Sequence, residues 1–286
     1  MVSTILVATD CSSHAVQAVK MAVNLGRALH ARVLVLHVFD TSYPAPAEMG
    51  AWEWAIGQGA FTEMVAAERE QVEKIAGGIL KDSGVDYKLV HAVGHPVQQI
   101  LDRAIQENVD MIVVGSRGAG GWQAVLLGSV ADGVMHQASR PVLVVRNPAE
   151  QVKVVLVATD GSECAHKAAA MASDLARAAG AELYGVHVLV PTRGRSSASS
   201  AETEAFDSKV YDSIECGFKA AAGNSSCHME RVTGHPAQAI TQYAEKIGAD
   251  IIVLGSRGLG PFKSLLVGSV SDTVAHHSNS SVLIVR

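Results

Sequence analysis

The sequence has 286 residues, of which 48% are hydrophobic and 18% are charged. This composition is too apolar for a disordered chain and is typical of one large or two ordinary globular domains. The formal net charge of −5 and the pI of about 6.2 indicate no basic surface for nucleic acid or an anionic membrane. We therefore expect neither as a partner.

The apolar runs are short and the cysteines are scattered. Runs such as residues 5–8 and 33–38 cannot cross a bilayer, which takes about 20 residues. No basic segment precedes the first run and Asp10 interrupts it, so we expect no signal peptide. The four cysteines form no Cys-x-x-Cys pair and have no zinc-ligand spacing. A soluble, reduced, cytoplasmic protein is predicted.

Strands and helices are predicted to alternate along the chain. Residues 4–9 (TILVAT) form a continuous apolar run, as expected of a strand covered on both faces, and Ser12 or Ser13 can cap the helix that follows. Further strands are predicted at residues 32–39, 87–93, 110–116 and 141–146, with helices at about 62–82, from Pro96 onward and around 130–137. This alternation predicts parallel pairing through right-handed crossovers.

The second half of the chain repeats the first. ILVATDCSSHA at residues 5–15 returns as VLVATDGSECA at 155–165, and GHPVQQI at 94–100 returns as GHPAQAI at 234–240. A repeat of this length is a whole domain rather than one unit of a solenoid. The sequence thus predicts two tandem α/β domains, residues 1–147 and 148–286, each a five-stranded, doubly wound, Rossmann-like parallel sheet. The joint at residues 147–151 is short, so the domains are expected to pack closely.

Both halves contain the glycine pattern Gly-x2-Gly-x9-Gly-Ser. Its members are Gly115, Gly118, Gly128 and Ser129 in the first half, and Gly255, Gly258, Gly268 and Ser269 in the second. The pattern follows the fourth strand, while Asp10 and Asp160 end the first strands. If these strands are neighbours, acid and glycines face one crevice at the carboxyl edge of the sheet. Glycines allow positive φ and close approach to a ligand, and a helix N-terminus favours an anion, so a polyphosphate site is predicted in each half.

These motifs resemble those of the universal stress protein family, in its tandem, ATP-binding form. VATD, GHP, the glycine pattern and the terminal PVLVVR carry the resemblance, which covers essentially the whole chain. It implies a sheet order of 3-2-1-4-5 and pairing through the fifth strands, here within one chain, with a homodimer left open. It also implies ATP, with Mg²⁺ held by the phosphates, at one adenine-nucleotide site per domain.

The resemblance assigns a role to each position of the motifs. Asp10 and Asp160 would lie against the adenosine, and Val38 and Val188 would offer backbone atoms to the adenine edge. The ribose would lie by Gly115 and Gly255, and the phosphates by Gly118, Gly128, Ser129, Gly258, Gly268 and Ser269. One local departure is Cys11, which stands where the second copy has Gly161; another is Ser281, which stands where the first copy has Pro141.

Two repeated residue pairs leave alternatives open. Arg117 and Arg257, inside the pattern, either pair with phosphate or are solvated. His95 and His235 of the GHP motifs are interpreted as groups that hydrogen-bond and pack at a helix entry, because no carboxylate recurs beside them to support a metal site or a base.

The residues favour binding over catalysis. No second acid recurs near the loop to hold Mg²⁺ or to act as a base, so we predict no catalytic residue and no metal held by the protein. The sequence favours an ATP-binding sensor or regulator in a stress response, with an unknown protein partner. A slow ATPase or an adenylyl- or phosphoryl-transfer enzyme is the alternative.

Overall fold

The computed structural model describes residues 2–41, 57–118, 127–146, 151–190, 200–223, 227–258 and 267–286, with the backbone alone at 57–61 and 200–209. The described chain forms two compact units, residues 2–138 and 139–286. None of the helices in these ranges is long and apolar enough to span a membrane.

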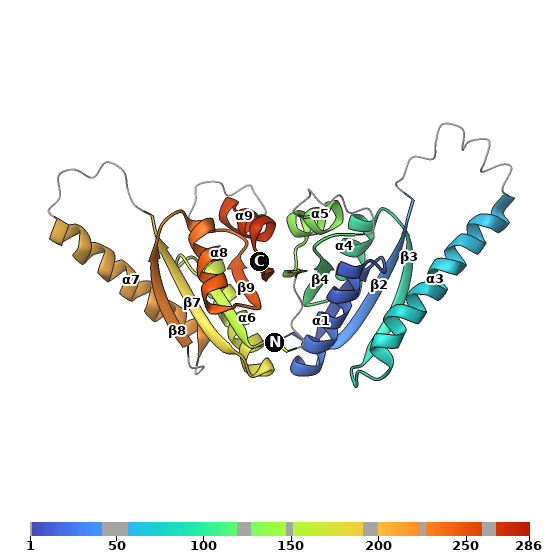
Figure 1. The fold of residues 1–286 in the computed structure, drawn as a ribbon, viewed down its shortest axis with the longest axis horizontal. Coiled ribbons are helices and arrows are strands. Elements are labelled where there is room, and N and C mark those ends of the chain that lie inside the picture. Colours follow the sequence, from blue (N-terminus) through green and yellow to red (C-terminus); the bar gives the residue numbers. More distant parts are fainter. Residues whose placement is uncertain are drawn as a thin grey trace, which may run out of the picture. The chain divides into compact units, whose positions relative to one another are not determined.

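The first sequence copy folds into alternating strands and helices (Figure 1). Its elements are β1 (Thr4–Thr9), α1 (Ser13–Leu29), β2 (Arg32–Asp40), α3 (Gly57–Lys81), β3 (Tyr87–Gly94), α4 (Pro96–Gln106), β4 (Met111–Gly115), α5 (Ser129–Gln137) and β5 (Val142–Val145). Strand β1 has its predicted bounds, and Ser12 caps α1 by accepting a hydrogen bond from Ala15 N at 3.3 Å. Helix α3 begins earlier than predicted, at Gly57, because its two early glycines are poor helix formers that hide the start.

The second copy repeats this order. Its elements are β6 (Val154–Ala158), α6 (Glu163–Ala179), β7 (Glu182–Leu189), α7 (Ser200–Ala222), β8 (Cys227–Thr233), α8 (Pro236–Ile247), β9 (Ile251–Gly255), α9 (Ser269–His277) and β10 (Ser281–Val285). Ser162 caps α6 as Ser12 caps α1, with Ala165 N as the donor at 3.3 Å. The repeat in the sequence is therefore a repeat in structure.

The strand order agrees with the prediction. In residues 2–138 the strands lie in the order β3-β2-β1-β4, and all are parallel. In residues 139–286 the order is β5-β10-β9-β6-β7-β8, with β5 antiparallel to β10 and the rest parallel. The second copy thus shows the order 3-2-1-4-5 in full.

Strand β5 comes from the first copy but lies in the second compact unit. Its Leu143 pairs with Leu283 of β10, and the Arg146 guanidinium donates to Ala275 O at 2.6 Å at the end of α9. Arg146 N also donates to Ser281 Oγ at 3.3 Å, which gives a role to the serine that stands where the first copy has Pro141. The division at residues 147 and 148 stays a prediction, and most of the predicted joint, 147–150, lies outside the described residues.

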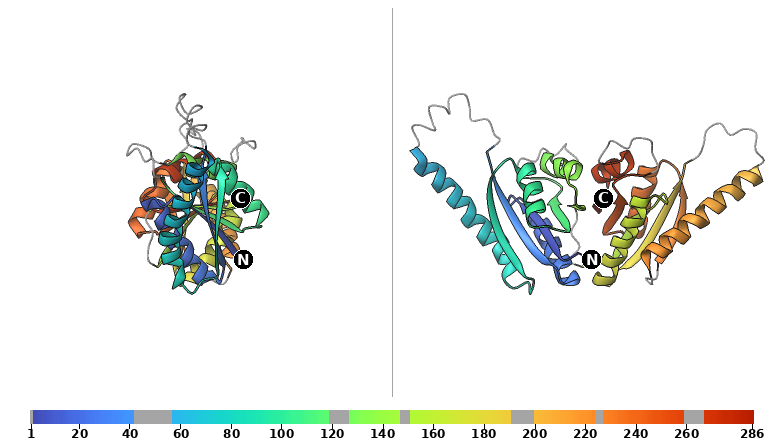
Figure 2. Two further views of the ribbon diagram at one scale, coloured as in Figure 1. Left: turned by 90° about the vertical axis from the view of Figure 1, so that its right-hand side faces the viewer. Right: turned by 180° about the vertical axis from the view of Figure 1, so that it is seen from behind.

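Helices cover both faces of each sheet. The side chains of Ile5, Leu6 and Val7 on β1 are fully buried, as expected of a central parallel strand. Helix α1 packs against β1, β4 and α3, whereas α4 packs against β2, β3 and α5. In the second copy, α6 packs against β6, β9 and α7, and α8 packs against β6, β7 and α9. Helix α3 runs beside β2 and β3, and α7 beside β7 and β8, in each view (Figure 1, Figure 2). The predicted doubly wound α/β fold is confirmed for both copies.

Candidate functional site

The pairing of first and fourth strands brings each acid to its glycine pattern. Val7 of β1 pairs with Val113 of β4, so Asp10, just after β1, lies beside the residues that follow β4. Asp10 Oδ1 accepts a hydrogen bond from Ser12 N at 3.0 Å, and a Cβ placed on Gly118 would lie 2.8 Å from Asp10 Oδ2. The acid and the glycine pattern of the first half are therefore neighbours, as predicted.

The second half has the same arrangement. Asp160 Oδ1 accepts from Ser162 N at 3.0 Å, and a Cβ on Gly258 would collide with Asp160 Oδ2. The Ser162 hydroxyl, which caps α6, also donates to Arg257 O at 3.4 Å. The start of α6 is thus tied to the first residues of the glycine loop.

Backbone hydrogen bonds close both loops. Gly128 N donates to Ser116 O at 2.8 Å, and Gly268 N donates to Ser256 O at 2.6 Å. These bonds place α5 and α9 beside the ends of β4 and β9, while residues 119–126 and 259–266 between them lie outside the described ranges. Gly128 and Gly268 are the N-cap residues of α5 and α9, and the described residues show no side-chain cap hydrogen bond at either helix. These two helices begin without the serine cap that α1 and α6 have, and a helix N-terminus of this kind favours an anion.

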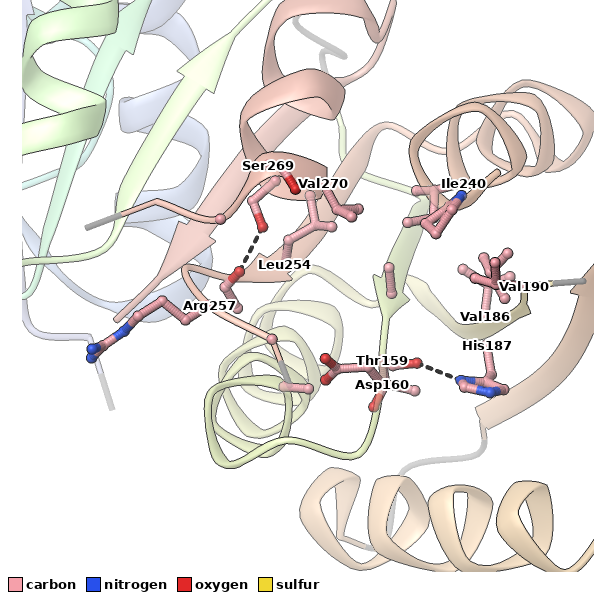
Figure 3. A pocket seen from close by; sticks show the side chains of 18 residues that line it. Thr159, Asp160, Val186, His187, Val190, Ile240, Leu254, Arg257, Ser269 and Val270 are labelled. Atoms are coloured by element: carbon pink, nitrogen blue, oxygen red, sulfur yellow. Dashed lines mark hydrogen bonds between the residues drawn. The ribbon is translucent and has the colours of Figure 1, made fainter. Parts of the chain in front are cut away.

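A cavity of about 740 Å³ lies at this edge of the second half (Figure 3). Its size falls in the range of roughly 300–1,000 Å³ that is typical of small-molecule sites. All seven residues predicted for this half line it: Asp160, Val188, Gly255, Arg257, Gly258, Gly268 and Ser269. The structure thus brings these residues together, while their contact with a ligand stays a prediction.

Apolar side chains form a second wall of the cavity, which sequence reasoning missed. It includes Val186, Val190, Ile240 and Leu254, and Val190 is 59% exposed. The i, i+4 spacing of Pro236, the last residue of GHP, and Ile240 on α8 was a usable signal for part of this wall.

A buried histidine supports the acid of this cavity. His187 Nδ1 donates a hydrogen bond to Thr159 O at 2.9 Å, one residue before Asp160 (Figure 3). The imidazole is 9% exposed and lies at the edge of the cavity lining. This bond fixes the end of β6, from which Asp160 projects.

The two motif arginines differ from one another. Arg257 is exposed, and its guanidinium points away from Asp160 and Ser269 (Figure 3). Arg117 is half-buried, and its Nε has no hydrogen-bond partner among the described residues. Arg257 thus resembles the solvated alternative, while for Arg117 the phosphate alternative stays a prediction.

The structure gives a steric reason for the glycines. Neither Gly118 nor Gly258 has positive φ, so the left-handed backbone that glycine allows is not used at these positions. Both are needed because a Cβ would meet the carboxylate beside it. Gly115 and Gly255 have a packing role: a Cβ on Gly115 would lie 2.7 Å from His14 C and O, in the backbone that opens α1.

The GHP histidines are not capping groups. His95 and His235 occupy the N-cap positions of α4 and α8, but neither side chain makes a cap hydrogen bond, and both residues are exposed. The predicted helix-entry hydrogen bond is therefore wrong. Pro96 and Pro236 set the helix start instead, because their fixed φ suits the first helical position.

Cys11 is the local departure that carries backbone strain. Its φ is 61°, in the left-handed region, where the second copy has Gly161 with φ 78°. Burial, together with the charge of Asp10, also raises the pKa of the Cys11 thiol, so the thiolate is disfavoured at neutral pH.

Replacing Cys11 by glycine is expected to stabilise the first half by about 1 kcal/mol, because glycine adopts this φ without steric cost. Urea unfolding followed by tryptophan fluorescence measures the effect, since all three tryptophans lie in the first copy. The reverse exchange, Gly161→Cys, should destabilise the second half, where a Cβ would also lie 3.0 Å from Ile214 Cγ1. An unchanged midpoint in Cys11→Gly would contradict the strain.

The fold and the motifs define the family. The family model described as "Universal stress protein family" matches residues 1–146 and again 151–286. The chain therefore belongs to the universal stress protein family, in a tandem form with two copies of the domain.

Individual relatives agree with this assignment. A universal stress protein of Mycolicibacterium smegmatis is 27% identical over 99% of this chain and 96% of its own length. A second, from Mycobacterium tuberculosis, is 31% identical over 62% of this chain; the match spans 61% of that relative's length. The crystal structure of a universal stress protein from Archaeoglobus fulgidus has a TM-score of 0.68 and 23% identity, covers 99% of this chain and 96% of its own, and supports the fold.

Proposed function

We propose that the protein binds an adenine nucleotide, ATP with Mg²⁺ on its phosphates, at one site in each half. In this proposal it acts in the cytoplasm as a nucleotide-dependent regulator of a stress response. The observation that supports this best is the convergence of Asp160, Gly258 and the first turn of α9 on one cavity with an apolar wall.

The apolar wall suits the base. Val186 and Ile240 offer aliphatic surface to a planar ring, and Val188, on the same wall, is the proposed backbone contact for the adenine edge. The Asp160 carboxylate is the proposed acceptor for the ribose hydroxyls, because one of its oxygens already bonds Ser162 N and the other faces Gly258. The counterparts in the first half are Val38 and Asp10.

The start of α9 suits the phosphates. No side-chain cap is present at this helix start among the described residues, and the helix dipole adds positive potential at the same place. The hydroxyl of Ser269 adds a donor. In the first half Ser129 and α5 offer the same groups, with Arg117 as a further donor.

The composition of the cavity favours binding over turnover. Among the described residues that line it, Asp160 is the one carboxylate. Phosphoryl transfer generally uses carboxylates that hold Mg²⁺ together with a group that positions the nucleophile. A regulator that senses bound nucleotide fits this lining better than an ATPase.

Calorimetric titration of nucleotide-free protein with Mg-ATP is expected to give about two ATP per chain. Asp160→Ala should weaken one site by about 10- to 100-fold, since hydrogen bonds to a charged group contribute roughly 1.5–3 kcal/mol and 1.4 kcal/mol is a factor of ten. Asp10→Ala should weaken the other, and the double variant both. Absence of binding heat over a range of temperatures would overturn the proposal.

A further inference from the structure

A pair of histidines and a glutamate join α3 to the sheet in the first half. Parallel register places His37 of β2 beside His91 of β3, with ring centroids 5.7 Å apart in an edge-on arrangement. Glu68 of α3 reaches this pair, with Oε2 3.6 Å from His37 Nε2. His37 is only 6% exposed, and both ring nitrogens of His91 are buried without a partner among the described residues.

The second half lacks this cluster. Three buried residues anchor each helix at the same spacing: Val72, Ala76 and Leu80 on α3, and Ile214, Phe218 and Ala222 on α7. When the two helices are aligned on these buried residues, Val210 of α7 lies at the position that Glu68 has on α3. The sheet register puts Arg231, in place of a second histidine, beside His187. The second half thus has one histidine, hydrogen-bonded to backbone, where the first has a pair.

We propose that His37, His91 and Glu68 form an acid-sensitive contact that holds the N-terminal part of α3 to the sheet of the first half and weakens below about pH 6.5. Neutral imidazoles pack edge to face at neutral pH. On protonation, two cations face each other with a single carboxylate in contact. The apolar anchors at Val72, Ala76 and Leu80 keep the rest of the helix in place.

Burial, more than the neighbouring charges, favours neutral histidines. The groups that face the two rings are Asp10 from the end of β1 and Glu68, Arg69 and Glu73 from α3. Burial lowers the pKa of His37, reinforced by His91 and Arg69 and opposed by Asp10. Burial also lowers the pKa of His91, with Arg69 reinforcing and Glu73 opposing.

The direction of the pH effect follows from these shifts. Since the folded form has the lower histidine pKa values, the opened form binds protons first as the pH falls through 6.5. The stability of the contact is therefore complete above that pH and is lost on acidification. Burial raises the pKa of Glu68, so this carboxyl binds its proton more readily in the closed form and partly offsets the effect of the histidines as the pH falls.

The contact lies beside the proposed nucleotide site but does not depend on it. His37 directly precedes Val38, and the charge of Glu68 adds to burial and Asp10 in raising the pKa of the Cys11 thiol. Loosening of α3 would therefore expose the first nucleotide site on the side of Asp10, and the second site would not change. Hydrogen exchange of the nucleotide-free protein measures the contact by itself, so its outcome is separate from that of the proposed function.

Hydrogen exchange of the full-length, nucleotide-free protein at pH 7.5 and 5.5 tests the contact. Exchange rates are corrected for their intrinsic pH dependence. Between pH 7.5 and 5.5, the loss of protection should then be at least about threefold larger for amides at 62–72 than for amides at 204–214. His91→Asn should remove this difference, while His228→Asn on β8 should keep it. Equal behaviour of the two helices, or an unchanged difference in His91→Asn, would overturn the proposal.

Proton NMR of the histidine rings in the wild-type protein provides a readout that needs no variant. His37 and His91 are expected to titrate below pH 6.5, in the range where α3 loses protection. Titration of both rings at or above pH 6.5 would contradict the contact even if His91→Asn failed to fold.

Discussion

Replacing Gly118 and Gly258 by valine is expected to abolish the stabilisation of the protein by ATP while both halves remain folded. A Cβ at Gly118 would lie 2.8 Å from Asp10 Oδ2, and at Gly258 it would collide with Asp160. The valine therefore displaces the carboxylate and fills the space proposed for the ligand. Both glycines are exposed and neither has positive φ, so the fold should lose little stability.

Thermal unfolding with and without Mg-ATP measures this effect. The wild-type protein should gain about 2.7 kcal/mol at a ligand concentration near 100 times its dissociation constant, and the double variant should gain almost none. Gly78→Val is a matched control, since a Cβ there meets no atom within 4 Å and lies outside the loop. A full ATP-dependent shift in the double variant would show that the phosphates are held elsewhere.

Replacing Gly115 or Gly255 by alanine is expected to destabilise the fold itself. The new Cβ would lie 2.7 Å from His14 C and O, or 2.8 Å from Cys164 C, which are backbone atoms that cannot move without moving a helix. Overpacking of this kind typically costs about 1–3 kcal/mol. One added methyl group should thus lower stability more than the larger valine does at Gly118.

Urea unfolding distinguishes the two kinds of glycine. Gly115→Ala should shift the tryptophan-detected midpoint of the first half to lower urea. Gly133→Ala should shift it less, because the nearest atom there, at 2.8 Å, is a methyl group of Val97 that can turn aside. A midpoint for Gly115→Ala equal to that of the wild-type protein would contradict the packing role.

The sequence predicted the central strands well because both their faces are buried. Residues 4–9 form an uninterrupted apolar run, and β1 has those bounds. The place of β5 was harder to predict from local pattern. Its pairing with β10 depends on residues far apart in the sequence, and the bond from Arg146 N to Ser281 Oγ is visible only in three dimensions.

The candidate site was predictable in its residues and less so in their roles. The repeated spacing identified Asp160 and Gly258 as partners, and the structure places them in contact. Periodicity cannot distinguish a glycine that leaves room for a carboxylate, such as Gly258, from one needed for helix packing, such as Gly255. The cluster of His37, His91 and Glu68 also escaped the sequence, because it depends on sheet register and on the rotation of α3.

The crystal structure of this protein grown with Mg-ATP tests the central claim most directly. The account predicts adenine against Val186 and Ile240, ribose at Asp160, and phosphates over Ser269 at the start of α9, with the same arrangement at Asp10 and Ser129. Nucleotide bound away from both glycine patterns, or saturating ATP that leaves both crevices without it, would contradict the account.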